Sequence, residues 1–176
     1  CLAPMARTLQ DAFGIRSGLI TTVHAYTGSQ RLIDTPHAKR RRGRAAAENI
    51  VPTTTGAANA VTTVIPELKG KLDGMAMRVP TPNGSVTDLV VDLEDDASVQ
   101  DVNDAFRENA DGRMDGVLRV SDEELVSRDI LGDPHSVIVD GPSTMSLDNG
   151  MVKILGWYDN EYGFSNRMID VARHIA

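Results

Sequence analysis

The sequence predicts an α+β fold, in which a largely antiparallel, mixed sheet has its helices packed on one face. Three observations lead to this prediction. Short apolar or alternating segments are typical of strands, an Asp-Asn-Gly turn at 148–150 joins two of them as a hairpin, and several segments have the apolar spacing of amphipathic helices. With 176 residues, 41% of them hydrophobic, the chain is long enough to bury a core.

The first half of the chain is expected to contain two helices and three strands. A helix is predicted over residues 2–13, where apolar side chains recur at helical spacing, and Gly14 is suited to end it. Residues 29–48 have no clear period, and a loop of this length inside a domain is usually functional. The other expected elements are a strand over 18–23, a helix over 56–65 and strands over 74–80 and 85–93.

The second half begins with a helix-start signal. Ser98 and Asp101 have the spacing of a capping box, which predicts a helix that starts at Ser98. Strands are then expected over 136–140, 144–147 and 151–158, and a final helix over 165–176. No glycine-rich G-x-G-x-x-G sequence follows a strand, so the chain itself is not expected to contain a dinucleotide-binding fold.

Composition and charge exclude several classes of protein. The formal net charge of −7 argues against a nucleic-acid-binding domain. No apolar stretch approaches the roughly 18 residues of a membrane span, and no signal-peptide pattern is found, so no membrane partner is expected. The single cysteine excludes an internal disulfide and fits the cytoplasm. The acids are mainly aspartates, which indicates either a salt-adapted protein or an ordinary acidic cytoplasmic enzyme.

Four positions are candidates for chemistry. His24 directly follows an apolar strand and is either a catalytic or a structural histidine; the four histidines have no metal-ligand spacing with the cysteine, so no metal is expected. Thr55 and Gly56 precede a helix, where hydroxyls and free N–H groups either bind an anion or simply cap the helix. Arg78, at the end of a strand, either clamps a phosphate or forms a surface ion pair.

Two further stretches have competing interpretations. The basic cluster at 39–44 has the composition of a nucleic-acid patch, but in an acidic chain it is more often a subunit contact or a set of partners for the acids. Asn160 follows the strand expected over 151–158, where its amide can read another amide through paired hydrogen bonds or can act as a turn residue.

Taken together and in order, these stretches resemble the catalytic, C-terminal domain of phosphorylating glyceraldehyde-3-phosphate dehydrogenases. The resemblance covers essentially the whole chain. The stretches that carry it are "CLAP", "TTVHAYT", "RRGRAAAENIVPTTTGAA", "ELKGKLDGMAMRVPTPNGSVTDL", "LVSRDI" and "VKILGWYDNEYGFSNR".

The resemblance implies an oxidoreductase of glycolysis and gluconeogenesis. Such an enzyme converts glyceraldehyde 3-phosphate, inorganic phosphate and NAD, or alternatively NADP, to 1,3-bisphosphoglycerate through a cysteine thioester. His24 matches the general base that pairs with the cysteine thiolate. Thr27 and Arg78 match the site for the substrate phosphate, and Thr55 and Gly56 match the site for the attacking phosphate.

The resemblance also implies a cofactor contact and an assembly. Asn160 matches the residue that holds the nicotinamide carboxamide. The loop over 26–48 matches a loop at the core of a homotetramer, where Pro36 borders the cofactor. Three residues depart from the family pattern: Thr35 replaces a leucine that often precedes Pro36 in NAD-dependent members, Ser29 replaces an aspartate, and Phe164 replaces a tyrosine.

The position of the cysteine leads to a further expectation. Cys1, directly before Leu2, matches the second cysteine of the family motif Ser-x-Cys-Thr-Thr-Asn-Cys-Leu-Ala-Pro. The nucleophile and a Rossmann domain are therefore expected upstream, with residues 1–164 as the catalytic domain and the helix over 165–176 docking on the Rossmann domain. The chain alone is expected to be inactive. The alternatives are erythrose-4-phosphate dehydrogenase and a non-catalytic assembly module.

Overall fold

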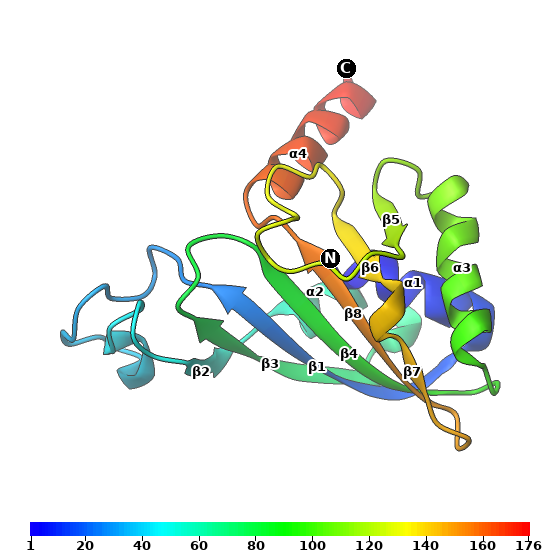
Figure 1. The fold of residues 1–176 in the computed structure, drawn as a ribbon, viewed down its shortest axis with the longest axis horizontal. Coiled ribbons are helices and arrows are strands. Elements are labelled where there is room, and N and C mark those ends of the chain that lie inside the picture. Colours follow the sequence, from blue (N-terminus) through cyan, green and yellow to red (C-terminus); the bar gives the residue numbers. More distant parts are fainter.

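A computed structural model describes residues 1–176 and contains one mixed sheet with helices on one face, which confirms the predicted α+β class (Figure 1). The strand order is β2-β3-β1-β4-β8-β6-β5, and β7 pairs with β8. The β1–β3 and β5–β6 pairs are parallel and the other pairs are antiparallel. The strands are β1 (Ile15–Ala25), β2 (Val51–Thr54), β3 (Leu72–Val79), β4 (Ser85–Leu93), β5 (Leu118–Ser121), β6 (Val137–Asp140), β7 (Met145–Ser146) and β8 (Met151–Tyr158).

Three helices cover one face of the sheet. They are α1 (Leu2–Phe13), α2 (Ala57–Val64) and α3 (Val99–Asp111), and their apolar sides join the inward side chains of the strands in one cluster of 22 buried residues. Leu9 of α1, Phe106 of α3 and Leu89 of β4 are fully buried in this cluster. The expected capping box is present, because the Ser98 hydroxyl accepts from Asp101 N–H and the Asp101 carboxylate accepts from Ser98 N–H.

The fourth helix lies outside this core. Helix α4 (Tyr162–Ile175) extends away from the sheet and ends at the C-terminus (Figure 1). Gly163 is its one buried residue, whereas Phe164, Met168 and Val171 expose most of their side chains. Helix α4 therefore presents an apolar surface that nothing in this chain covers.

The structure differs from the sequence prediction in several places. Strand β1 starts at Ile15, and the short strands β2 and β5 were not predicted. β2 contains Pro52, which is tolerated because β2 is the edge strand of the sheet. Helix α4 starts at Tyr162 and not at 165, because the Asp159 carboxylate accepts the N–H groups of Glu161 and Tyr162 and so begins the first turn earlier.

The strand register places functional side chains at one end of the sheet. In the parallel β1–β3 pair, His24 lies opposite Arg78, so both side chains point to the helix-covered face. In the antiparallel β4–β8 pair, Ser85 lies opposite Tyr158. The carboxyl ends of β1, β3 and β8 and the start of β4 therefore meet at one edge of the fold.

The opposite face of the sheet is open. Leu19 is 67% exposed there and Met75 is 36% exposed, while Lys153 and Asp88 form an ion pair across β8 and β4. No helix in the structure combines the length and the apolar character needed to cross a membrane.

Candidate active site

A cavity of about 330 Å³ opens at the carboxyl ends of β1 and β3, next to the start of α2. It brings together four of the residues singled out in the sequence, namely His24, Thr55, Gly56 and Arg78. Two buried threonines, Thr22 of β1 and Thr87 of β4, also line the cavity and lie opposite each other in the β1–β4 ladder. Neither was singled out from the sequence.

His24 is held with one particular nitrogen free. Its Nδ1 lies 2.6 Å from the carbonyl oxygen of Ala25. Because a carbonyl only accepts hydrogen bonds, Nδ1 carries the proton in the neutral ring and Nε2 keeps its lone pair. The ring of Tyr158 meets the imidazole edge-on, with a centroid distance of 6.1 Å and an interplanar angle of 76°. His24 is therefore oriented as a base with a single accepting nitrogen.

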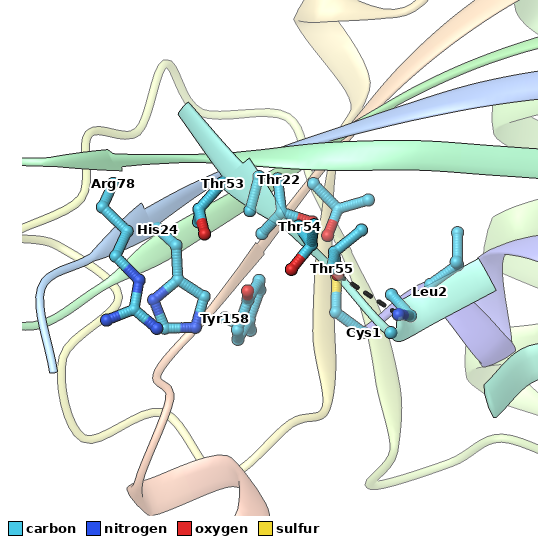
Figure 2. A pocket seen from close by; sticks show the side chains of 13 residues that line it. Cys1, Leu2, Thr22, His24, Thr53, Thr54, Thr55, Arg78 and Tyr158 are labelled. Carbon is cyan, nitrogen blue, oxygen red and sulfur yellow. Dashed lines mark hydrogen bonds between the residues drawn. The ribbon is translucent and has the colours of Figure 1, made fainter. Parts of the chain in front are cut away.

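Arg78 has no carboxylate partner. Its Nη1–H donates to Thr27 Oγ1 over 2.7 Å, and in Figure 2 its side chain lies next to that of His24. Burial, and secondly the charge of Arg42, lower the pKa of Arg78, whose guanidinium nevertheless stays charged. The surface ion pair that competed with the phosphate interpretation is not present.

A second arginine, Arg42, lies beside this group. Its Nε–H donates to Thr53 Oγ1 over 3.0 Å, and its Nη1–H donates to Ser29 Oγ over 3.4 Å. The hydroxyls of Ser29 and Thr27 lie 3.1 Å apart, so the two arginines are linked through hydroxyl groups. Two guanidinium groups joined by neutral hydroxyls make a site suited to an anion with two charges.

Sequence reasoning missed Arg42 because it lies among the basic residues at 39–44, which carry no spacing that separates one from another. The short helical turn over Arg40–Gly43 turns this one side chain toward Thr53 on strand β2. Arg44, another arginine of this basic cluster, forms an ion pair with Asp34 on the exposed loop instead.

Thr55 and Gly56 combine the two interpretations that the sequence left open. Gly56 is the N-cap of α2, and Thr55 Oγ1 accepts the N–H of Ala57 over 3.2 Å, as the dashed line in Figure 2 shows. Thr55 therefore satisfies one free N–H group at the start of α2, and both Thr55 and Gly56 also line the cavity. A Cβ placed on Gly56 would meet no atom within 4 Å, so the space above its backbone is open to a ligand.

Asn160 lies in a second cavity, of about 280 Å³, that is separate from the first. Both polar atoms of its amide are buried and have no hydrogen-bond partner. Since buried polar groups are almost always paired, an amide of this kind fits a ligand that carries both a donor and an acceptor, such as a carboxamide. Cys1 and Tyr158 line both cavities and so form the boundary between them.

Asp159 holds the segment that carries Asn160. Asp159 is 4% exposed, and its Oδ1 accepts from the N–H groups of Glu161 and Tyr162 over 3.1 and 2.9 Å. Its Oδ2 accepts from Gly132 N–H and Asn83 Nδ2 over 3.0 and 3.1 Å. Burial raises the pKa of Asp159, but these four donors outweigh burial and lower it overall.

Pro36, like Asn160, is a predicted site residue that does not line the first cavity. It lines an exposed hollow of the loop with Asp34, His37 and Arg40, away from the cavity that His24 lines. No group of three or more histidine, cysteine, aspartate or glutamate side chains is arranged to hold a metal ion.

Comparison with known proteins identifies the family of the chain. The family model described as "Glyceraldehyde 3-phosphate dehydrogenase, C-terminal domain" matches residues 1–160. The chain is 62% identical over 99% of its length to a glyceraldehyde-3-phosphate dehydrogenase of Haloarcula vallismortis, and 57% identical over 100% of its length to one of Geobacillus stearothermophilus. It spans about half the length of these curated relatives, 52% in each case.

Proposed function

The chain belongs to the family of glyceraldehyde 3-phosphate dehydrogenase C-terminal domains, and from this premise we propose that it is the catalytic and phosphate-binding part of a dehydrogenase that oxidises and phosphorylates glyceraldehyde 3-phosphate. The observation that carries this proposal is the cavity in which His24, Thr55, Gly56 and Arg78 meet. A base with one free nitrogen adjoins an anion site that contains no carboxylate.

In this proposal His24 acts on a cysteine thiolate in the segment expected before Cys1. An imidazolium beside a thiol stabilises the thiolate and gives its proton to the oxygen of the aldehyde as the sulfur adds to the carbonyl carbon. The neutral ring then accepts that proton back at Nε2 as the adduct loses a hydride, which the nicotinamide would accept, and becomes a thioester. The hydrogen bond from Nδ1–H to the Ala25 carbonyl supports this role, because it keeps Nε2 free for the exchange. Inorganic phosphate then attacks the thioester carbon, which displaces the cysteine thiolate and releases an acyl phosphate.

The two phosphate groups are proposed to occupy opposite sides of Arg78. The pair formed by Arg78 and Thr27, 2.7 Å apart, supports a site for the substrate phosphate, to which Arg42 adds a second positive charge. The open backbone at Thr55 and Gly56 supports a site for the attacking phosphate at the start of α2.

The proposed cofactor is NAD, with NADP as the alternative. Its nicotinamide would supply the hydride acceptor, and the unpaired amide of Asn160 supports a role in holding the carboxamide. The apolar surface of α4 supports the docking of a dinucleotide-binding domain, with residues 1–164 as the catalytic domain. The proposed role of Pro36 beside a cofactor requires a neighbouring subunit, because Pro36 lies away from Asn160 within this chain.

The proposed assembly is a cytoplasmic homotetramer. The exposed apolar side chains of the open sheet face, among them Leu19 and Met75, support contact with a second copy of the chain. The loop over 26–48 adds a second exposed apolar surface at Leu32 and Ile33.

The test of the function is NADH or NADPH formation from glyceraldehyde 3-phosphate and phosphate. The protein that includes the upstream segment is expected to be active, and the 176-residue chain alone is expected to be inactive. The reason is that hydride transfer needs the nicotinamide to be held against the substrate carbon that is bonded to the cysteine sulfur. Activity of the chain alone that Cys1→Ser abolishes would make Cys1 the nucleophile. A higher kcat/KM for erythrose 4-phosphate would favour the other dehydrogenase, and no activity in the longer protein would favour an assembly module.

A further inference from the structure

The Ser85 hydroxyl accepts a backbone N–H of β1 just beyond the end of the β1–β4 ladder. The last backbone pair of this ladder is Val23 with Val86. Beyond this pair, the N–H of Ala25 donates to the side-chain oxygen of Ser85, with a distance of 3.0 Å between Ala25 N and Ser85 Oγ. Ser85 is 2% exposed and Ala25 is fully buried, so water cannot easily replace this hydroxyl. The bond keeps β1 extended through the residue that follows His24.

Ala25 is held on its other side as well. The peptide group that contains the Ala25 carbonyl is fixed at its nitrogen, because the N–H of Tyr26 donates to the Thr81 carbonyl over 3.1 Å. The same Ala25 carbonyl lies 2.6 Å from His24 Nδ1. A carbonyl whose direction is fixed in this way stabilises the ring form with the proton on Nδ1.

Tyr158 links Ser85 to the imidazole ring. It lies directly opposite Ser85 in the β4–β8 ladder and packs edge-on against His24. Burial raises the pKa of Tyr158 to about 12, and the Ser85 hydroxyl is a smaller influence in the opposite direction. The phenol therefore stays neutral in the physiological range, which leaves it a packing role against His24.

We propose that Ser85 is a positioning residue for His24, acting through Ala25 and Tyr158 to keep the ring proton on Nδ1 and the lone pair of Nε2 directed into the cavity. The hydroxyl of Ser85 touches neither substrate nor cofactor in this arrangement. Its importance for catalysis rests on the proposed function, in which His24 is the base, but its effect on the ring can be measured without any substrate.

The experiment measures the ring form of His24 by nuclear magnetic resonance. The chain is labelled with ¹⁵N-histidine, and long-range ¹H–¹⁵N correlations are recorded at about pH 8.5, above the ordinary histidine pKa of about 6.5. His24→Asn identifies the signal of this histidine among the four in the chain. The wild-type protein is expected to carry the proton on Nδ1, and Ser85→Ala is expected to shift both nitrogen signals toward the form protonated on Nε2.

Ser121→Ala is the matched control. Ser121 is a buried serine, 4% exposed, whose hydroxyl also accepts a backbone N–H, that of Glu123 over 3.2 Å, but which does not contact His24. This variant is expected to leave the His24 signals unchanged. An equal shift in Ser121→Ala would mean that any lost buried hydroxyl perturbs the ring, which would overturn the proposal.

Two other results would also overturn it: a wild-type ring protonated mainly on Nε2, or a folded Ser85→Ala protein with wild-type nitrogen signals. If circular dichroism shows that Ser85→Ala is unfolded, Tyr158→Phe decides instead, because it removes only the phenol oxygen of the residue that lies opposite Ser85 and packs against His24. It is expected to shift the signals in the same direction, and unchanged signals would refute the proposal. A failed dehydrogenase assay would remove the proposed function while leaving this result valid.

Discussion

Replacing Asp159 by asparagine should destabilise the protein more than any other change of a single charge at this end of the sheet. The carboxylate accepts four hydrogen bonds, two at each oxygen, from the segments that carry Asn83 and Gly132 and from the start of α4. An asparagine has only one acceptor oxygen. Whichever way its amide is turned, two donors lose their acceptor and face an NH₂ group instead.

The magnitude follows from this count. A hydrogen bond to a charged group contributes about 1.5–3 kcal/mol, so two lost bonds amount to about 3–6 kcal/mol. In a domain of this size, each kcal/mol lowers the melting temperature by about 2–4 °C, so a fall on the order of 10 °C is expected. The helix that begins at Tyr162 should fray first, because two of the four donors belong to its first turn.

The assay is thermal unfolding followed by circular dichroism at neutral pH. Asp148→Asn, an exposed aspartate of the turn before β8, makes the same chemical change and is expected to alter the melting temperature by less than about 2 °C. An equally small effect of Asp159→Asn would mean that the four hydrogen bonds of this carboxylate contribute little to stability.

The dependence on pH provides a second check. The pKa of Asp159 is lowered in the folded protein, so its stabilising contribution is complete above the ordinary aspartate pKa of about 3.9 and is lost as the pH falls through the folded value. The difference in stability between wild type and Asp159→Asn should therefore be constant from neutral pH down to about 5 and should shrink only below about 4.

Three further predictions concern the candidate site. In the protein that includes the upstream segment, Arg78→Lys should lose the two-pronged recognition of phosphate and reduce kcat/KM by about 5- to 150-fold, which corresponds to about 1–3 kcal/mol; an unchanged value would contradict the assignment. His24→Asn should leave the circular dichroism spectrum intact and raise the pKa of the reactive cysteine, measured by the pH dependence of alkylation with iodoacetamide, and a cysteine pKa that does not rise would exclude the ion pair. A crystal soaked in sulfate should show an anion near Thr55 and Gly56 without any cofactor, and an ordered loop with no such density would count against the site.

Most of the fold could be predicted because its elements carry strong local signals. Strands β4 and β8 have the predicted bounds, and so does α1, since apolar periodicity and flanking turn residues mark them directly. Strand β5 was missed because four residues with an arginine among them have no readable period. The start of α4 was missed because it depends on Asp159, whose other contacts come from distant segments.

The candidate site could be predicted only in part, for a related reason. His24 and Arg78 stand at strand ends within recognisable stretches, and the structure places them in one cavity. The contribution of Arg42 depends on how the loop over 26–48 folds back onto β2, which no local pattern describes. Ser85 was not singled out because a serine at the start of a strand is ordinary until its neighbours in space are known.

The parallel pairing of β1 and β3 has a consequence for how this sequence can change over evolution. His24 and Arg78 are 54 positions apart in the chain, yet the ladder of backbone hydrogen bonds alone sets their spacing. Neighbouring strand residues are therefore free to exchange one apolar side chain for another. The loss or gain of a single residue within β3 is a different matter, because it would turn Arg78 to the opposite face of the sheet. Variation in length should thus be confined to the connecting loops, while both strands keep their residue count.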